Sequence, residues 1–385
     1  MSKNIFCGLG KDVPYAHFMN LLDTSFGHES FEKGFISFLP KLYREELRPQ
    51  DQNYVVTEDG DLAAAVGAYD HQIRVCGRML NCRGIGNVAV HPSHRSKGYM
   101  NLAMEAAMRG MIEDGVAIST LGGRRQRYLY FGYDKAGPVY HYSISRDNMR
   151  HALGGMESPF TLREITDPKD EAIDKIIAIN DALPFAPVRS REQFLDIANS
   201  WNARLLAAYD GERFAGYLVL KDTRVTEIEV VDKADFLSLI RSVYAFLGEG
   251  YTVFLLPQQL DYRLALTPIA EGMTLATAMH FNILNYRAVT EAFLALKLTY
   301  ENLPDGEITL LIHGYARNEC IKIAVAGGEA SVTAVDESTP VDYELSHAEA
   351  LSFLFSPISP LRECASDIAK LYFPLPLTMR HADEV

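Results

Sequence analysis

A short segment with two basic residues and a glycine carries the clearest chemical signal in this sequence. Residues 88–100 read Val-Ala-Val-His-Pro-Ser-His-Arg-Ser-Lys-Gly-Tyr-Met. The valine-rich start predicts a strand, and the polar stretch that ends at Gly98 predicts a loop that opens a helix. The first amides of a helix have no partner within it, and the helix dipole adds positive charge there. The segment therefore predicts a pyrophosphate site, with Arg95 and Lys97 as additional charges.

The residues expected to bind this ligand all lie in the same segment. Gly98 has no Cβ, so the backbone can approach a phosphate closely there. The end of the strand at 88–90 offers backbone hydrogen bonds to a ligand that carries amide groups. The predicted binding residues are Val88, Ala89, Val90, His94, Arg95, Ser96, Lys97, Gly98, Tyr99 and Met100.

This segment resembles the acetyl-CoA motif of the GCN5-related N-acetyltransferases, the GNAT superfamily. The shared pattern is Val-x-Val-x-Pro-x-x-Arg-x-x-Gly, and it usually continues to a small residue where this chain has Met100. The resemblance implies acetyl-CoA as cosubstrate and transfer of its acetyl group to an amine, with no metal. A generic strand-to-helix turn that carries basic residues is the alternative interpretation.

A second candidate position follows the buried strand predicted at 116–121. Tyr128 stands three residues before the Phe-Gly-Tyr sequence at 131–133. By resemblance to the same superfamily, a tyrosine at this position is the general acid toward the departing thiolate. A phenol of pKa near 10 can protonate a thiolate of similar basicity, so the chemistry is reasonable. Tyr130 is the rival if the register differs, and a packing role for Tyr128 is the other alternative.

Two further groups of side chains are open to more than one interpretation. The basic run at 124–127 can contact the 3′-phosphate of CoA, contact an anionic substrate, or form a solvated turn. Aromatic residues near the N-terminus can line a substrate pocket, although core packing is the safer expectation for them; they are Phe26, Phe31, Phe35 and Phe38.

The elements around these motifs predict a mixed sheet with a helix crossing it. Strands are expected at 52–58, 62–69, 78–82, 84–91 and 116–121, and a helix at 99–114. Strand, glycine loop, helix and strand form one right-handed crossover. After a linker-like stretch at 147–160 a similar order recurs, with strands at 205–209, 214–220, 225–231 and 251–256 and helices at 171–180 and 233–247. There the stretch 229–237 has no glycine and carries acids, so we expect no CoA binding.

The last hundred residues predict a small α+β domain. Helices are expected at 287–296, 346–355 and 361–369, and strands at 307–314, 320–325 and 330–334. The three-part order resembles the Eis (enhanced intracellular survival) group. The implied fold is α/β and α+β: two tandem GNAT-like mixed-sheet domains plus a small sterol-carrier-protein-like C-terminal domain. The implied units are a catalytic GNAT domain at 1–150, a degenerate second one at 151–278 and the sterol-carrier-like domain at 279–385.

The Eis resemblance also implies site residues and partners. The α-carboxylate of Val385 is expected to enter the acetyltransferase site as general base or as an anchor for the amine. Glu384 is a neighbouring candidate for binding a cationic substrate. The implied acceptor is a small amine, aminoglycoside-like or polyamine-like, and the implied assembly is a homo-oligomer, a hexamer of trimeric rings.

Composition narrows the classes of partner. The sequence has 37 basic and 50 acidic side chains and a formal net charge of −13. Nucleic-acid binding needs a basic face, so no nucleic-acid partner is expected. The charge is compatible with a cationic substrate, although an acidic surface that merely keeps a protein soluble is the safer expectation. No apolar run is long enough to cross a bilayer and the N-terminus lacks a signal-peptide pattern, so we expect a cytoplasmic protein without a membrane partner. Five scattered cysteines predict reduced thiols and no metal site.

Other functions stay open at this point. The chain can be a CoA-sensing or apolar-ligand-binding protein without turnover, or a protein-lysine acetyltransferase. An intact Tyr128 beside an intact phosphate loop favours catalysis.

Overall fold

A computed structural model describes residues 3–27, 34–156 and 158–385 of the chain. The strands are β1 (Ile5–Leu9), β2 (Asn53–Glu58), β3 (Asp61–Val75), β4 (Arg78–Val90), β5 (Ile118–Leu121), β6 (Asp134–Ile144), β7 (Thr161–Glu164), β8 (Phe185–Pro187), β9 (Arg204–Asp210), β10 (Arg213–Lys221), β11 (Arg224–Val230), β12 (Tyr251–Leu255), β13 (Gly272–Ile283), β14 (Gly306–His313), β15 (Asn318–Ala326), β16 (Glu329–Ala334) and β17 (Tyr343–Ser346). The helices are α1 (Tyr15–Phe26), α2 (Gly34–Phe38), α3 (Pro40–Tyr43), α4 (Tyr99–Glu113), α5 (Arg125–Tyr128), α6 (Arg146–His151), α7 (Ala172–Ala182), α8 (Phe194–Ala198), α9 (Phe236–Leu247), α10 (Leu260–Leu266), α11 (Tyr286–Leu298), α12 (His347–Phe355) and α13 (Asp367–Tyr372).

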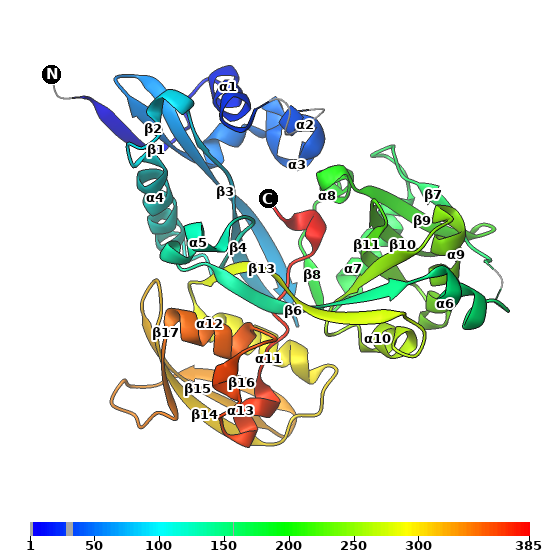
Figure 1. Cartoon of the computed structure of the whole chain (residues 1–385). Coiled ribbons are helices and arrows are strands. Elements are labelled where there is room, and N and C mark those ends of the chain that lie inside the picture. Colours follow the sequence, from blue (N-terminus) through cyan, green and yellow to red (C-terminus); the bar gives the residue numbers. More distant parts are fainter. Residues whose placement is uncertain (1–2, 28–33, 157) are drawn as a thin grey trace.

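Two sheets organise these elements (Figure 1). Within the described ranges, thirteen strands form one sheet in the order β1-β2-β3-β4-β5-β13-β6-β12-β11-β10-β9-β7, with β8 paired to β3. Four more strands form a separate sheet in the order β16-β15-β14-β17. The predicted fold class, mixed α/β with an α+β part, is confirmed.

The first part of the large sheet is an antiparallel meander joined to a parallel pair. β2, β3 and β4 pair antiparallel, and β4 pairs parallel with β5. α4 covers this part of the sheet with an apolar face that includes the buried Met104, Ala107 and Met111. The strands predicted at 78–82 and 84–91 form one strand, because the intervening Arg83 is paired with β3 and does not break the ladder.

Strand β13 joins the unit predicted at 1–150 (the first unit) to the one predicted at 151–278 (the second unit). It pairs antiparallel with β5 on one side and with β6 on the other. β6 in turn pairs with β12 of the second unit. A strand from residues 272–283 therefore covers an edge of β5 that would otherwise expose unpaired backbone groups. The predicted boundary between residues 278 and 279 lies inside this strand.

The unit predicted at 279–385 (the C-terminal unit) packs three helices on its own four-stranded sheet. Residues of α11, α12 and α13 share one buried apolar cluster with β14 and β15. The prediction of a helix at 361–369 is wrong. A short 3₁₀ turn at Pro360–Arg362 is followed by α13, which begins only after Ser366, whose hydroxyl accepts a hydrogen bond from the Ala369 amide.

The last residues leave the C-terminal unit and run between the first and second units (Figure 1). Buried ion pairs hold this segment. Arg189 contacts Glu227 at 2.8 Å and Asp383 at 2.6 Å, and its side chain is 3% exposed. Arg380 contacts Glu229 at 3.0 Å. The segment is thus attached to β11 of the second unit by charges that have little access to water.

A second set of contacts attaches the same segment to the first unit and to the loop after α8. The buried Lys41 Nζ donates to the carbonyl oxygens of Ala382 at 2.6 Å and Glu384 at 2.5 Å. Trp201 Nε1 donates to the Glu384 carbonyl at 3.0 Å. Burial lowers the pKa of Lys41 to about 8. The backbone from 382 to 384 is therefore fixed from two sides.

Replacing Arg189 by leucine should destabilise the fold, because Glu227 and Asp383 would stay buried without their shared partner. We expect a loss of about 3–5 kcal/mol in the free energy of unfolding. The matched control is Arg224→Leu, which removes an exposed pair with Asp222 and should cost less than about 1 kcal/mol. Urea unfolding of both variants measures the difference. Equal losses would show that the buried pairs contribute no more than a surface pair.

Candidate active site

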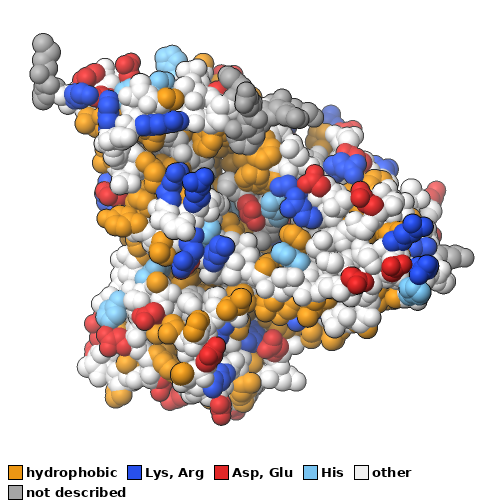
Figure 2. Space-filling view, in the orientation of Figure 1, with side chains coloured by type: hydrophobic (Ala, Val, Ile, Leu, Met, Phe, Trp, Pro, Cys, Tyr) orange, Lys and Arg blue, Asp and Glu red, His pale blue; other side chains and the backbone are white. Residues whose placement is uncertain are grey.

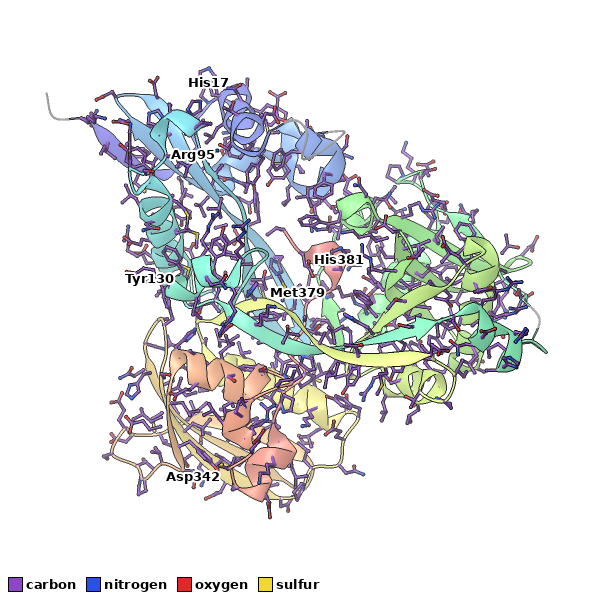
Figure 3. The ribbon with its side chains drawn as sticks, in the orientation of Figure 1. His17, Arg95, Tyr130, Asp342, Met379 and His381 are labelled. Carbon is purple, nitrogen blue, oxygen red and sulfur yellow. The ribbon has the colours of Figure 1, made fainter. Side chains whose placement is uncertain are left out.

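A cavity of about 550 Å³ lies where β4 ends and α4 begins. Its lining residues are Ser25, Phe26, Val88, Val90, His94, Arg95, Ser96, Gly98, Tyr99, Met100 and Arg127. Eight of the ten predicted binding residues are among them. Figure 3 labels Arg95 at this loop, and Figure 2 shows basic, acidic and histidine side chains around the hollow between the first and second units. The predicted anion segment thus lines one cavity, together with Arg127.

The other two predicted binding residues point elsewhere. Ala89 is 2% exposed and packs in the apolar cluster on the other side of β4, together with Phe18. Lys97 Nζ contacts Glu58 Oε2 at 2.6 Å. Hydrogen bonds from Lys3 and Lys97 lower the pKa of Glu58 to about 2, so this carboxylate stays charged. The charge of Lys97 is therefore paired, and Arg95 and Arg127 are the cations that line the cavity.

Backbone conformation explains the glycine at the helix start. Gly98 caps α4 with φ 80°, in the left-handed region that L side chains rarely adopt. A Cβ added at Gly98 would meet no atom of the described chain within 4 Å. Conformation rather than crowding by the protein therefore requires glycine there, and the open space beside the first amides of α4 stays available to a ligand.

A bulge in β4 separates it from β5. The two strands pair in parallel only from Cys82 to Ile85. Asn87 then adopts a φ of 36°, and the β3–β4 register shifts beside it. Its side chain accepts a hydrogen bond from Tyr69 at 2.6 Å and donates one to Asn53 at 2.7 Å. Beyond this bulge, residues 88–90 form no ladder with β5 in the described pairs, which leaves backbone groups on that side for a ligand.

The second unit has a similar divergence, but its own side chains bind the backbone there. β11 and β12 pair only at Arg224 and Val225. Further along β11, the Val230 amide donates to Tyr262 Oη at 3.2 Å, and Gln259 Nε2 donates to the Ile228 carbonyl at 3.1 Å. Both side chains come from the segment around α10. Two backbone groups at this end of β11 are therefore already hydrogen-bonded by the chain itself.

Tyr128 and Tyr130 lie in different environments. Tyr128 ends α5, is 6% exposed, and packs against Gly123, where an added Cβ would lie 3.0 Å from the tyrosine ring. Burial raises its pKa, so the phenol stays protonated through the neutral range. Tyr130 is 79% exposed and lies at the outer edge of the molecule (Figure 3). Of the basic run, Arg125 is paired with Asp134 at 2.7 Å.

Val385 lies directly on β4. A Cβ at Gly84 would be 2.2 Å from its Cγ2, and a Cβ at Gly86 would be 3.5 Å from its carboxyl carbon. Phe35 and Phe38 belong to the same apolar cluster as Val385, whereas Phe31 lies outside the described residues. No motif of the sequence marks the two strand glycines as part of a site. Glycine inside a strand is a signal of close approach by another group, and here that group is Val385.

Glu384 lines a second cavity of about 220 Å³ that also includes Glu227, Thr378 and His381. Its Oε2 lies 3.1 Å from His381 Nδ1. Figure 3 places His381 and Met379 in the middle of the molecule, between the first and second units. Because Glu384 precedes Val385, this cavity adjoins the end of the C-terminal segment.

No described helix combines the length and the apolar composition that crossing a bilayer requires. No three His, Cys, Asp or Glu side chains of the described ranges gather as a metal site would need.

Comparisons with known proteins address the fold and the first unit. Residues 11–136 match the acetyltransferase (GNAT) domain family. No curated protein matches the sequence. A GCN5-related N-acetyltransferase from Kribbella flavida is similar in structure, with a TM-score of 0.67, 18% identity, and coverage of 100% of this chain and 99% of that one. A GCN5-related N-acetyltransferase from Anabaena variabilis has a TM-score of 0.67, 13% identity and 98% coverage of both chains. Eis1 from Mycobacterium abscessus has a TM-score of 0.61, 14% identity and full coverage of both chains.

The matched range contains the cavity, the helix start and Tyr128, and the structural similarity spans the complete described architecture. Domains of this family transfer acetyl groups from acetyl-CoA. Residues 11–136 therefore form a GNAT acetyltransferase domain, and the fold of the whole chain is similar to that of Eis1.

Proposed function

We propose that this chain transfers the acetyl group of acetyl-CoA to an amine of a small cationic molecule, aminoglycoside-like or polyamine-like. The observation that carries the proposal is the divergence of β4 from β5, around which a cavity of about 550 Å³, Tyr128 and Val385 are arranged. Residues 1–150 form the catalytic unit in this proposal, residues 151–278 a degenerate copy, and residues 279–385 a sterol-carrier-like unit.

The cosubstrate is bound by backbone groups and by arginine. The first amides of α4 and the side chain of Arg95 bind the pyrophosphate. The backbone of Val88 and Val90 binds the amide-bearing arm, which takes the place of the missing strand partner. An amide in the same stretch polarises the thioester carbonyl. The lining of the cavity by these residues supports this assignment.

The reaction is a direct transfer. The nitrogen of a neutral amine attacks the thioester carbonyl carbon, and the carbon–sulfur bond breaks. Tyr128 gives its phenolic proton to the departing thiolate, and the carboxylate of Val385 takes the proton that the new amide loses. The raised pKa of Tyr128 supports its role as an acid, and the contact of Val385 with Gly84 and Gly86 supports its role as a base. Holding both reactants together removes much of the entropic barrier.

The negative charge of the chain supports a cationic acceptor. The formal net charge of −13 favours the approach of a cation. Glu384, the residue before Val385, lines the second cavity, and its carboxylate can bind a second ammonium group of a polyamine. This supports a substrate with several amines spaced along a flexible or polyhydroxylated frame.

The direct test measures thiol release from acetyl-CoA with spermidine, an aminoglycoside and a lysine peptide as acceptors. We expect release only with the small amines. Gly98→Trp should abolish acetyl-CoA binding in calorimetry, because a side chain would fill the space at the helix start. Gly248→Trp, at another left-handed glycine (φ 74°) with open surroundings, should leave binding unchanged. Binding without release would favour a CoA sensor, and a preference for the peptide would favour a protein acetyltransferase.

Tyr128→Phe should lower kcat by about 10²-fold or more, since a positioned general acid contributes on that order. The KM for acetyl-CoA should not change, because the phenol is assigned no role in binding. Tyr130→Phe, two residues away and exposed, is the matched control and should be neutral. Steady-state kinetics at pH 7 distinguish them. A larger effect of Tyr130→Phe would reverse the assignment.

Adding one glycine after Val385 should displace the carboxylate and lower kcat at pH 7 by about 10²-fold. The loss should be similar at pH 7 and pH 9, because the fraction of neutral acceptor amine rises equally for both chains and an α-carboxylate is charged throughout this range. Val385→Ile retains the carboxylate and serves as control. An extended chain with an unchanged kcat would exclude the carboxylate as base.

A further inference from the structure

The turn that follows Tyr128 is bound by side chains from much later in the sequence. A 3₁₀ turn at Leu129–Phe131 leads to Gly132, which has a φ of 83°. The Phe131 carbonyl accepts a hydrogen bond from Asn282 Nδ2 at 2.8 Å. The Gly132 carbonyl accepts one from His347 Nε2 at 2.9 Å. Both carbonyls are therefore satisfied from outside the first unit, by β13 and by the first residue of α12.

The hydrogen bonds of His347 define its tautomer. Its Nδ1 accepts from the Tyr315 amide at 3.2 Å, and a backbone amide can only donate. Nδ1 therefore carries no proton, and Nε2 carries the proton that goes to the Gly132 carbonyl. The ring is neutral, and burial lowers the pKa of His347 in agreement with this. Tyr286 Oη also donates to the His347 carbonyl at 3.0 Å, which holds the start of α12.

Close packing makes this contact rigid. A Cβ at Gly132 would lie 2.7 Å from Asn282 Nδ2 and 2.8 Å from the Tyr315 ring. Asn282 is fully buried and is paired in register with Ser119, whose hydroxyl lies 2.6 Å from Tyr133 Oη. The turn is thus enclosed by β5, β13 and the C-terminal unit.

Backbone hydrogen bonds connect this turn to Tyr128. The Tyr133 amide donates to the Tyr128 carbonyl at 3.3 Å, and the Gly132 amide donates to the Leu129 carbonyl at 3.0 Å. A shift of the Gly132 carbonyl would therefore move the backbone that carries the phenol. A displacement on the order of 1 Å at a reacting group can cost about 10²-fold in rate.

We propose that His347 is a positioning residue for Tyr128. Through the Gly132 carbonyl it fixes the turn and thereby the direction of the phenol toward the leaving sulfur. The inference rests on the proposed function, in which Tyr128 is the general acid. It gives the C-terminal unit a role in the acetyl-transfer step that is independent of any ligand the unit binds.

The test compares two replacements of His347 that differ in donor reach. His347→Gln keeps an amide that can reach the Gly132 carbonyl, and His347→Phe keeps the ring volume without a donor. We expect His347→Phe to lower kcat on the order of 10-fold, with the KM for acetyl-CoA unchanged, and His347→Gln to retain most of the rate. His313→Phe, on the exposed end of β14 where the ring contacts Glu344 at 2.8 Å, is the matched control and should be neutral. Should His347→Phe not fold, His347→Asn takes its place, since its shorter amide does not reach.

A double-mutant cycle separates this inference from the proposed function. In a Tyr128→Phe background, His347→Phe should lower kcat no further, because the group it positions is absent. An equal loss in both backgrounds, or no loss in the wild-type background, would overturn the inference. An unchanged kcat for Tyr128→Phe alone would overturn the acid assignment in the proposed function instead.

Discussion

The divergence of two parallel strands governs the rest of this structure. Parallel strands that separate leave amides and carbonyls without partners, and buried backbone groups must be satisfied by something. The bulge at Asn87 creates this situation at the end of β4, and hydrogen bonds from Tyr69 and to Asn53 keep it in place. The helix start at Gly98 lies beside Val88 and Val90 beyond this bulge, and Val385 contacts Gly84 and Gly86 just before it. The site is therefore organised around backbone groups that the fold itself leaves unpaired.

All three units contribute to that region, and they do so through contacts of different kinds. The second unit contributes buried charge: Arg189 pairs with Asp383 of the C-terminal segment, Glu229 pairs with Arg380 of that segment, and a buried charge that lost its partner would destabilise the fold. The C-terminal unit contributes neutral hydrogen bonds through His347. β13 contributes a strand ladder. The segment at 382–384 contacts Lys41, Arg189 and Trp201, so its position depends on the assembled chain rather than on local propensity.

The sequence predicts the local part of this arrangement well. The segment 88–100 contains its strand, loop and helix start within a short stretch, so one pattern carries most of the site, and eight of its ten named residues line the cavity. Contacts between distant residues were not predictable in this way. Asn282 and His347 are ordinary polar residues in their own segments, and their function arises only from the placement of β13 and α12 against Gly132. Nor does periodicity reveal that β13 enters the sheet of the first unit, since its pairing partners are more than a hundred residues away.

The hydrogen bonds that Gln259 and Tyr262 make to β11 bear on what this strand end can accept. Both side chains occupy backbone groups that a bound ligand would otherwise use. A ligand would have to displace them first, and the free energy of the two broken hydrogen bonds would be subtracted from its affinity. The chain therefore competes with any ligand for its own backbone at the end of β11.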